Sequence, residues 1–208
     1  MSQIAKINVS SFQSWIFGLK NISFDSNYLP KEFFVFIEGK QVGSIVPFSF
    51  NDLVTDDKIC KLVKWRNTHY KSFISNQKVN FHGTRTWLGK QILENVNREL
   101  FWVLNENMDF IGHIGILYDE VHSRFEFDNI LRGGVSAKGL IWMSMKIVED
   151  SIHKNFNADQ IFLRVLKSNT KAILFYRRNG FKELTLSDET SMSKESIELT
   201  LMVKNISK

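Results

Sequence analysis

Residues 169–181 read Asn-Thr-Lys-Ala-Ile-Leu-Phe-Tyr-Arg-Arg-Asn-Gly-Phe, and this stretch decides the fold of the chain. It follows an alternating apolar run, Gln160–Leu166, which predicts a β-strand. Asn179-Gly180 then provides a left-handed stop of the kind that ends many helices. Between the two, the apolar residues recur at helical spacing: Ala172, Phe175 and Tyr176. The sequence therefore predicts a strand followed directly by an amphipathic helix.

The composition of the 208-residue chain is that of a globular protein, with 43% apolar and 24% charged residues. Its 27 basic and 22 acidic residues are interspersed, so we expect no nucleic-acid partner. The single cysteine, Cys60, excludes an internal disulfide and zinc sites built on paired cysteines, and we expect no metal. No apolar run approaches the ~20 residues of a membrane span, and no signal-peptide core is present. We therefore expect a cytoplasmic protein without a membrane span.

The remaining elements predict an α/β fold with a mixed sheet. In chain order they are helices at 56–68 and 84–97, strands at 100–104, 110–118 and 124–130, a helix at 140–155, and, after the opening stretch, strands at 181–186 and 197–203. Thr84 is the expected cap of the second helix. An antiparallel meander followed by a strand–helix–strand crossover gives a mixed sheet with helices on both faces.

The pattern Asn-x-x-Ala-x-x-Phe-Tyr-x-x-x-Gly-Phe at 169–181 strongly resembles the C-terminal half-motif of the GCN5-related N-acetyltransferases, the GNAT superfamily. The element order from about residue 50 onward is also that of the GNAT fold. The resemblance implies that residues 51–208 form an acetyltransferase domain. Such a domain would move the acetyl group of acetyl-CoA to a primary amine.

The same resemblance assigns the pyrophosphate of the cofactor to the loop Leu131–Leu140, because the start of a helix offers unpaired backbone N–H groups. Matching Gly139 to the first family glycine puts Ser136 where Arg or Gln is usual. It also puts Ile141 where a small residue is usual, so this half-motif is degenerate. The residues expected to hold acetyl-CoA are Ile130, Leu131, Arg132, Ala137, Lys138, Gly139, Leu140, Asn169, Phe175 and Arg178.

Tyr176 matches the family tyrosine that faces the cofactor sulfur, and Asn169 matches the residue that bonds the pantetheine arm. A phenol with a pKa near ~10 stays protonated at neutral pH, so it can donate a proton to a leaving thiolate. The resemblance therefore implies that Tyr176 is the general acid.

The expected general base is a carboxylate on the strand before the loop. Glu126 and Asp128 lie two residues apart on that strand, and so on one face of it. Glu126 lies further from the loop, at the depth expected for the acetyl group. His113 and His122 remain alternatives, whereas Cys60 lies among apolar residues at helical spacing and is expected in the core.

The acceptor is suggested by the end of the first predicted helix and the start of the second. Trp65-Arg66-Asn67, together with Arg85 and Trp87, resembles the acetyltransferases of nucleotide-linked aminodeoxy sugars, including those of the pseudaminic acid pathway. Aromatic rings over a nucleobase and an arginine against a diphosphate would hold such an acceptor. Packing of the two tryptophans between helices explains the pattern equally well. We expect these residues to bind a small-molecule substrate of surface-polysaccharide biosynthesis.

Two other functions remain open. The GNAT fold also acetylates protein N-termini and ribosomal proteins, and that branch has similar helices. The degenerate pyrophosphate loop would also suit a non-catalytic acyl-CoA-binding domain. Turnover with release of free CoA separates the last function from the others.

Residues 1–50 have no counterpart in the family. Trp15 and Phe17 are too apolar for a disordered tail, and Glu32–Glu38 and Gln41–Val46 flank Gly39-Lys40 as in a β-hairpin. We expect this N-terminal extension to pack on the core or on a second subunit, as part of the acceptor side of the cleft. The sequence leaves both a monomer and a homodimer open.

Overall fold

A computed structural model describes residues 9–20, 33–53, 55–184 and 198–207. Its strands are β1 (Phe34–Ile37), β2 (Lys40–Pro47), β3 (Arg98–Asn105), β4 (Phe110–Asp119), β5 (Arg124–Arg132), β6 (Gln160–Leu166), β7 (Lys182–Glu183) and β8 (Leu199–Asn205). They form one sheet in the order β1-β2-β3-β4-β5-β6-β8-β7. Within it, β5 and β6 pair in parallel and the other neighbours pair antiparallel. The predicted α/β fold with a mixed sheet is confirmed.

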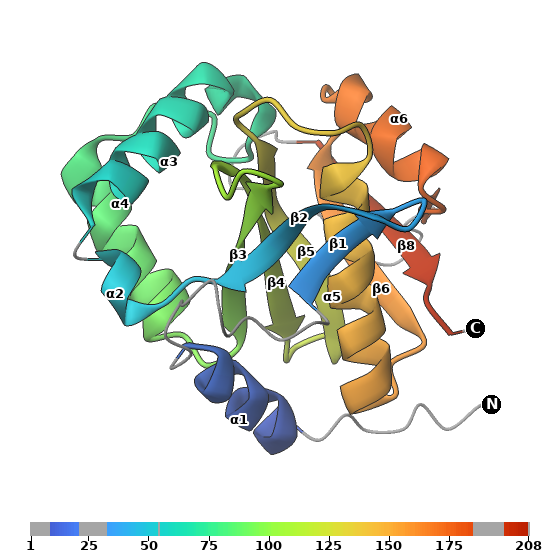
Figure 1. Ribbon diagram of the computed structural model, residues 1–208. Coiled ribbons are helices and arrows are strands. Elements are labelled where there is room, and N and C mark those ends of the chain that lie inside the picture. Colours follow the sequence, from blue (N-terminus) through green and yellow to red (C-terminus); the bar gives the residue numbers. More distant parts are fainter. Residues whose placement is uncertain (1–8, 21–32, 54, 185–197, 208) are drawn as a thin grey trace.

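Helices cover both faces of this sheet (Figure 1). They are α1 (Val9–Lys20), α2 (Phe50–Leu53), α3 (Asp56–Thr68), the short η2 (Tyr70–Ser72), α4 (Phe81–Trp87), the π-helical η3 (Leu88–Leu93), α5 (Leu140–Phe156) and α6 (Thr170–Arg178). One buried cluster joins α1 and α5 to the sheet, and a second cluster joins α3 and η3 to it. Among the described residues, no helix is long and apolar enough to cross a membrane.

The predicted elements agree closely with those observed where the hydrophobic period is clear. Helix α3 and strand β6 have the predicted bounds, and α5 ends one residue beyond its prediction. Only Lys182–Glu183 of the strand predicted at 181–186 is observed as a strand. The predictions for residues 32, 185–186 and 197 lie outside the described residues.

The second predicted helix was placed wrongly. Asn80, not Thr84, caps it, because the Oδ1 atom of Asn80 accepts a hydrogen bond from the backbone N–H of Gly83 at 2.7 Å. The chain then widens into the π-helical turn of η3, where the N–H of Glu94 bonds the carbonyl of Gly89 at 2.9 Å. This wider turn places three apolar side chains in the second core: Leu88, Ile92 and Leu93.

The prediction for Cys60 was also wrong. Ile59 is fully buried beneath α3, whereas Cys60 is exposed. One residue along a helix turns the side chain by about 100°, so the neighbour of a core residue faces outward. The charged first turn of α3, with Asp56 and Asp57, did not reveal which of the two adjacent apolar residues faced the sheet.

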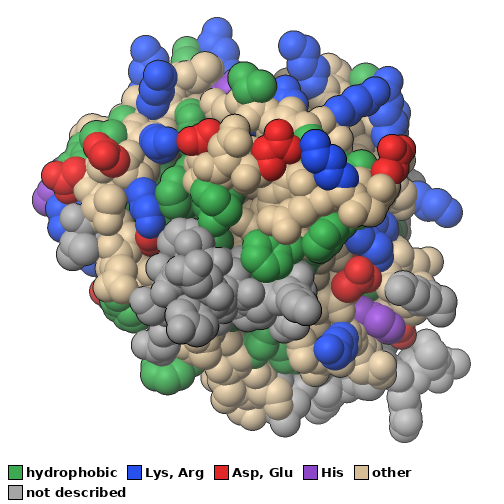
Figure 2. Space-filling view, in the orientation of Figure 1, with side chains coloured by type: hydrophobic (Ala, Val, Ile, Leu, Met, Phe, Trp, Pro, Cys, Tyr) green, Lys and Arg blue, Asp and Glu red, His purple; other side chains and the backbone are tan. Residues whose placement is uncertain are grey.

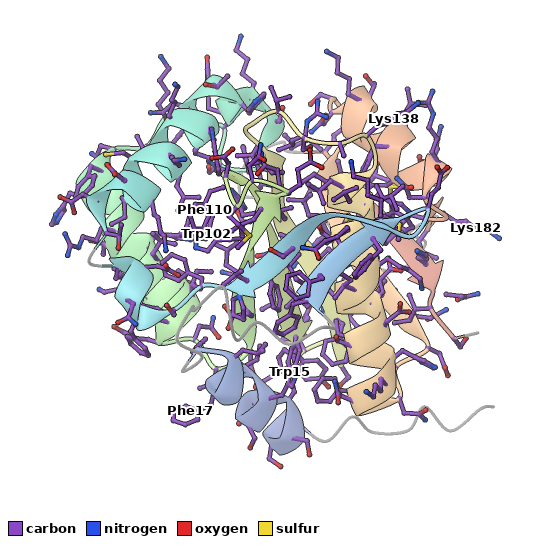
Figure 3. All side chains as sticks on the ribbon, viewed as in Figure 1. Trp15, Phe17, Trp102, Phe110, Lys138 and Lys182 are labelled. Carbon is purple, nitrogen blue, oxygen red and sulfur yellow. The ribbon has the colours of Figure 1, made fainter. Side chains whose placement is uncertain are left out.

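The N-terminal extension shares the sheet and the core with the rest of the chain. The hairpin β1–β2 extends the sheet, with β2 antiparallel to β3. In α1, Phe12 is fully buried and its ring centroid lies 5.1 Å from that of Phe125. Figure 3 shows Trp15 directed toward this aromatic group and Phe17 directed away from it, and Phe17 is 70% exposed. Burying a large apolar side chain is worth about 1.5–3 kcal/mol, so α1 stabilises this end of the sheet.

Candidate active site

A cleft opens where β5 and β6 separate. The two strands pair at only two positions, the second being Phe127 with Leu163. Directly afterwards β5 contains a bulge, because its register with β4 shifts before Gly115 and Asn129 has a φ of 45°. The resulting cleft has a volume of about 800 Å³ and is lined by both strands, the start of α5 and one side of α6. Figure 2 shows lysine and arginine side chains along the upper edge of the molecule.

The N-terminus of α5 forms one end of the cleft. Gly139 has a φ of +92°, and α5 begins at the next residue with no acidic side chain in its first turn. The bulky Ile141 fits here because a Cβ atom on Gly112 of β4 would lie 3.2 Å from its Cδ1 atom, in space that glycine leaves empty. The positive end of the helix dipole is thus not neutralised by a carboxylate of its own first turn.

Most of the residues predicted to hold the cofactor line this cleft. These are Ile130, Leu131, Arg132, Ala137, Gly139, Leu140, Asn169 and Phe175. Lys138 and Arg178 are exposed and lie outside the lining. Lys138 belongs to the loop that leads into α5 (Figure 3), and Arg178 ends α6.

Tyr176 lines the cleft from α6. Its ring packs between those of Phe175 and Phe181, at centroid distances of 5.4 and 5.9 Å. Burial raises the pKa of its hydroxyl to about 12. The phenol is therefore protonated throughout the neutral range and can act as a proton donor in the cleft.

Asn169 has a structural role at the start of the same helix. Its Oδ1 atom accepts a hydrogen bond from the backbone N–H of Ala172 at 3.2 Å, so it is the N-cap of α6. Its Nδ2 atom donates to the carbonyl of Ser72 at 3.4 Å, which joins α6 to the turn η2. Asn169 thus lines the cleft and also links two of its walls.

Glu126 is held by two arginines. Its side chain is 3% exposed, its Oε1 atom accepts from Arg124 and its Oε2 atom accepts from Arg164. The nitrogen–oxygen distances of these bonds are 2.7–2.9 Å. Both oxygens of this carboxylate are therefore occupied by arginine N–H groups, which leaves neither of them free to contact a substrate.

Asp128 is less constrained than Glu126. Its Oδ2 atom lies 3.1 Å from Arg98 and 2.9 Å from the Nδ2 atom of Asn129. Its Oδ1 atom is buried against Gly115 and has no partner in the described part of the chain. Burial raises the pKa of this carboxyl, and the positive charge of Arg98 opposes that shift. Of the two carboxylates, Asp128 has fewer cationic partners and a raised pKa, and both features favour it as a general base.

A second cavity of about 490 Å³ lies between α3, α4 and the middle of the sheet. It borders the cleft, because five residues line both spaces: Arg66, Phe73, Ser75, Trp87 and Asn129. Its inner end is formed by buried side chains of α3, α4 and β3, and its outer end by exposed residues of the segment 75–83.

Arg66 lies at the junction of the two spaces. Its guanidinium carbon is 3.4 Å from the centroid of the Phe73 ring, and its Nη2 atom donates to Ser75 at 2.6 Å. Burial lowers its pKa to about 10, and no carboxylate of the described residues pairs with it. A half-buried cation without an anionic partner favours an anionic ligand.

The two histidines differ sharply. His113 is 7% exposed, lines the second cavity and has a pKa lowered to about 4 by burial, so it is neutral at pH 7. His122 is exposed in the turn after β4 and its Nδ1 atom lies 2.7 Å from Asp119. Neither histidine lines the cleft between β5 and β6.

The residues predicted to bind the acceptor fall into two groups. Arg66 and Trp87 line both spaces. Trp65 is instead buried against Gly133, and Asn67 makes two hydrogen bonds with the backbone of Val79. Arg85 likewise lies outside both linings and is paired with Asp56 at 3.6 Å. Trp65 is therefore a core residue, packed on the loop after β5 and near the ring of Trp102 in β3, at a centroid distance of 6.4 Å.

Sequence reasoning missed Arg98 and Arg164, the cations that separate the behaviour of the two carboxylates. The alternating pattern of β6 indicates only that Arg164 faces away from the core, and no sequence motif includes Arg98. None of the described residues of the N-terminal extension, 9–20 and 33–50, is part of either lining. The hairpin β1–β2 instead supports the start of α5, with Leu140 packed on Gly43.

Comparison with known proteins identifies the fold. No protein-family model and no curated protein matches the chain. The spermidine N-acetyltransferase of Vibrio cholerae in complex with CoA and spermine superposes with a TM-score of 0.59 at 19% identity, covering 78% of this chain and 95% of that one. Apo FdhC, a nucleotide-linked sugar GNAT, gives 0.58 at 16% identity, covering 79% and 86%. The chain therefore has the fold of the GNAT acetyltransferases.

Proposed function

We propose that the protein is an acetyl-CoA-dependent N-acetyltransferase that acts on a primary amine. The observation that carries the proposal is the cleft between β5 and β6. There, two separated strand edges, an uncapped helix N-terminus and the protonated phenol of Tyr176 line one space. A long donor with a pyrophosphate at one end and a thioester at the other needs these three features together.

The cleft fits acetyl-CoA at each of these points. Backbone N–H groups near Ala137, Gly139 and Leu140 would hold the pyrophosphate, with Lys138 and Arg178 as basic groups outside the lining. The edge of β5 at Ile130–Arg132 would pair with the pantetheine arm beside Asn169 and Phe175, because this edge is no longer paired with β6. Bound acetyl-CoA would supply the activated acyl group as a thioester.

Asp128 and Tyr176 then serve as base and acid. Asp128 takes the proton of the substrate ammonium, directly or through one water molecule, which leaves the amine lone pair free to form the C–N bond. As the C–S bond breaks, the Tyr176 hydroxyl would give its proton to the sulfur, and the second proton of the attacking nitrogen would restore the phenol, directly or through water. Glu126 has a different role, since its pairs with Arg124 and Arg164 tie β5 to β6 where the cleft begins.

We further propose that the acceptor is the amino group of a nucleotide-linked amino sugar. A polyamine carries several positive charges and would need free carboxylates, whereas Glu126 and Asp128 are both paired with arginines. Arg66 has no such partner and favours an acceptor that carries phosphate. FdhC, with the same fold, is a sugar GNAT.

An acceptor panel tests the proposal. Purified protein is incubated with acetyl-CoA and, separately, with a nucleotide-linked 4-amino-4,6-dideoxy sugar, spermidine or an N-terminal ribosomal-protein peptide. Free thiol and product mass are measured, and Tyr176→Phe controls for background hydrolysis. We expect acetylation of the sugar. Acetylation of the peptide or of spermidine alone would overturn the acceptor assignment, and acetyl-CoA binding without any turnover would leave a non-catalytic acyl-CoA-binding domain.

A further inference from the structure

The inner end of the second cavity holds two polar groups that nothing in the described chain satisfies. The Oγ1 atom of Thr84 and the Nδ1 atom of His113 are both buried and have no hydrogen-bond partner there. The ring of His113 interacts with the backbone of Asn129, and its Nδ1 atom is the ring nitrogen left without a partner. Leaving buried polar groups unpaired costs free energy, so these two groups favour a bound ligand with hydroxyl or N–H groups.

The charges around the cavity exclude one class of ligand. Arg66 and Lys78 line it, and no acidic residue is found in its described lining. A ligand with several positive charges would therefore meet only cations and neutral groups. A ligand with a phosphate near Arg66 and an uncharged polar group further inside would meet complementary groups at both positions.

The remaining walls suit a ring. Trp87 and Phe73 present aromatic surface, and Leu62 and Leu100 present aliphatic surface beside Thr84. Flat or puckered rings with polar edges bind between such surfaces, because the faces are apolar and the edges form hydrogen bonds.

The cavity also reaches the proposed base. Asn129 lines both spaces, and its Nδ2 atom donates to Asp128 at 2.9 Å. A ligand in the cavity would therefore be separated by the Asn129 side chain from the carboxylate that would receive the proton of the acceptor amine.

From these observations we infer that the second cavity binds an uncharged, hydrogen-bonding ring of the acceptor through Thr84 and His113, with an adjoining phosphate at Arg66. The inference rests on the proposed transfer to an amine in the cleft, and it assigns the ring and the phosphate of the acceptor to particular residues of the second cavity. Sugar phosphates and nucleotides share this chemistry, since each joins a polar uncharged ring to a phosphate.

Calorimetric titration tests the inference, with protein saturated by CoA so that no turnover occurs. The probes are glucosamine 1-phosphate, uridine monophosphate, glucosamine and spermidine. We expect at least one of the phosphate-bearing probes to bind more tightly than glucosamine and spermidine. Binding of glucosamine 1-phosphate alone identifies the ring as the sugar, and binding of uridine monophosphate alone identifies it as the nucleoside.

Two variants report on the inner end of the cavity. Thr84→Val keeps the shape of the side chain and removes the hydroxyl, and we expect it to weaken the bound probe about five- to tenfold. Thr86→Val, exposed on the same helix and outside both linings, is the matched control and should change nothing. His113→Leu should weaken the same probe. Thermal melts check that each variant is folded. If His113→Leu does not fold, Thr84→Val alone tests the cavity.

Two results would overturn the inference. One is tighter binding of spermidine than of either phosphate-bearing probe. The other is equal probe affinity in Thr84→Val and Thr86→Val. Binding of acetyl-CoA, measured in parallel, separates this failure from that of the proposed function. If acetyl-CoA binds and is turned over, only the assignment of the second cavity is wrong. If acetyl-CoA does not bind, both the proposed function and this assignment are wrong.

Discussion

The two halves of the candidate site, the cleft and the second cavity, differ in whether backbone or side chains form them. The half between β5, β6 and α5 uses backbone: a bulge at Asn129, a strand edge left unpaired and a helix that begins after Gly139. The half between α3, α4 and the sheet uses side chains. Among the described residues, Arg66 has no carboxylate partner and the hydroxyl of Thr84 has no hydrogen-bond partner. Backbone features depend little on which residue stands at each position, so the first half tolerates a degenerate motif. The second half depends on particular side chains and is where specificity would reside.

The largest expected effect is that of Tyr176→Phe. Loss of the proton donor should lower kcat by about 10²–10⁴-fold, whereas the Kd of acetyl-CoA should stay nearly the same. Because the pKa of Tyr176 is about 12, the wild-type rate should show no loss of this acid as the pH rises toward 10. Steady-state kinetics and calorimetric titration of acetyl-CoA measure the two quantities. An unchanged kcat would mean that Tyr176 only packs against Phe175 and Phe181.

A smaller loss, about 10²-fold in kcat at neutral pH, is expected for Asp128→Asn. Its raised pKa means that the wild-type rate falls as the pH decreases through that value, because only the ionised form accepts a proton. The variant should lack this acid limb in its pH–rate profile. Glu126→Gln should keep the limb and instead lower the melting temperature, since it loosens the pairs with Arg124 and Arg164. The opposite pattern would restore Glu126 as the base.

Arg66→Gln should weaken binding of the acceptor without changing binding of acetyl-CoA. It should raise the KM of the acceptor about 10–100-fold, the effect expected when a charged hydrogen bond is lost. The Kd of acetyl-CoA should not change, because the start of α5 and the strand edge do not involve Arg66. Arg85→Gln is the matched control, since Arg85 pairs with Asp56 outside both spaces. An equal weakening of acetyl-CoA and acceptor would show that the halves are not independent.

The smallest effect concerns a buried carboxyl group in β3 that lies outside both linings. Glu99 of β3 is fully buried, and burial raises its pKa to about 8. The folded state then holds this proton more tightly than the unfolded state, so stability is lost as the pH rises from about 4.5 to about 8. Glu99→Gln should remove this dependence and stabilise the protein by about 1–2 kcal/mol at pH 9. Thermal melts at pH 6 and 9 measure the effect, with the exposed Glu106→Gln as control. A wild-type melting temperature that does not fall over this range would contradict it.

The sequence predicted the first half of the site better than the second. The strand Gln160–Leu166 and the helix to its C-terminal side carry a backbone motif whose residues are contiguous, so the period and the glycine stop revealed them. Tyr176 came with that motif. The preference for Glu126 over Asp128 rested on depth along one strand, and the arginines that distinguish them come from β3 and β6.

The residues of the second cavity could not be predicted from short stretches of sequence. Its inner end joins Thr84 of α4 to His113 of β4, residues that are brought together only by the folded sheet. Alternation on β4 could show that His113 faces one side, but not that burial leaves its Nδ1 atom without a partner. Likewise, Trp65 and Trp87 are both tryptophans of helices that pack on the same face of the sheet. Trp65 nevertheless packs on Gly133, and of the two only Trp87 lines the cavities.

The central claim is that the cleft between β5 and β6 is a donor site that works independently of the acceptor half. Calorimetric titration of wild type and Arg66→Gln with acetyl-CoA tests it most directly. The account predicts one equivalent bound with the same Kd in both proteins. At 100 times that Kd, the folded state should gain about 2.7 kcal/mol. Absence of both heat and a melting shift in folded wild-type protein would contradict the account.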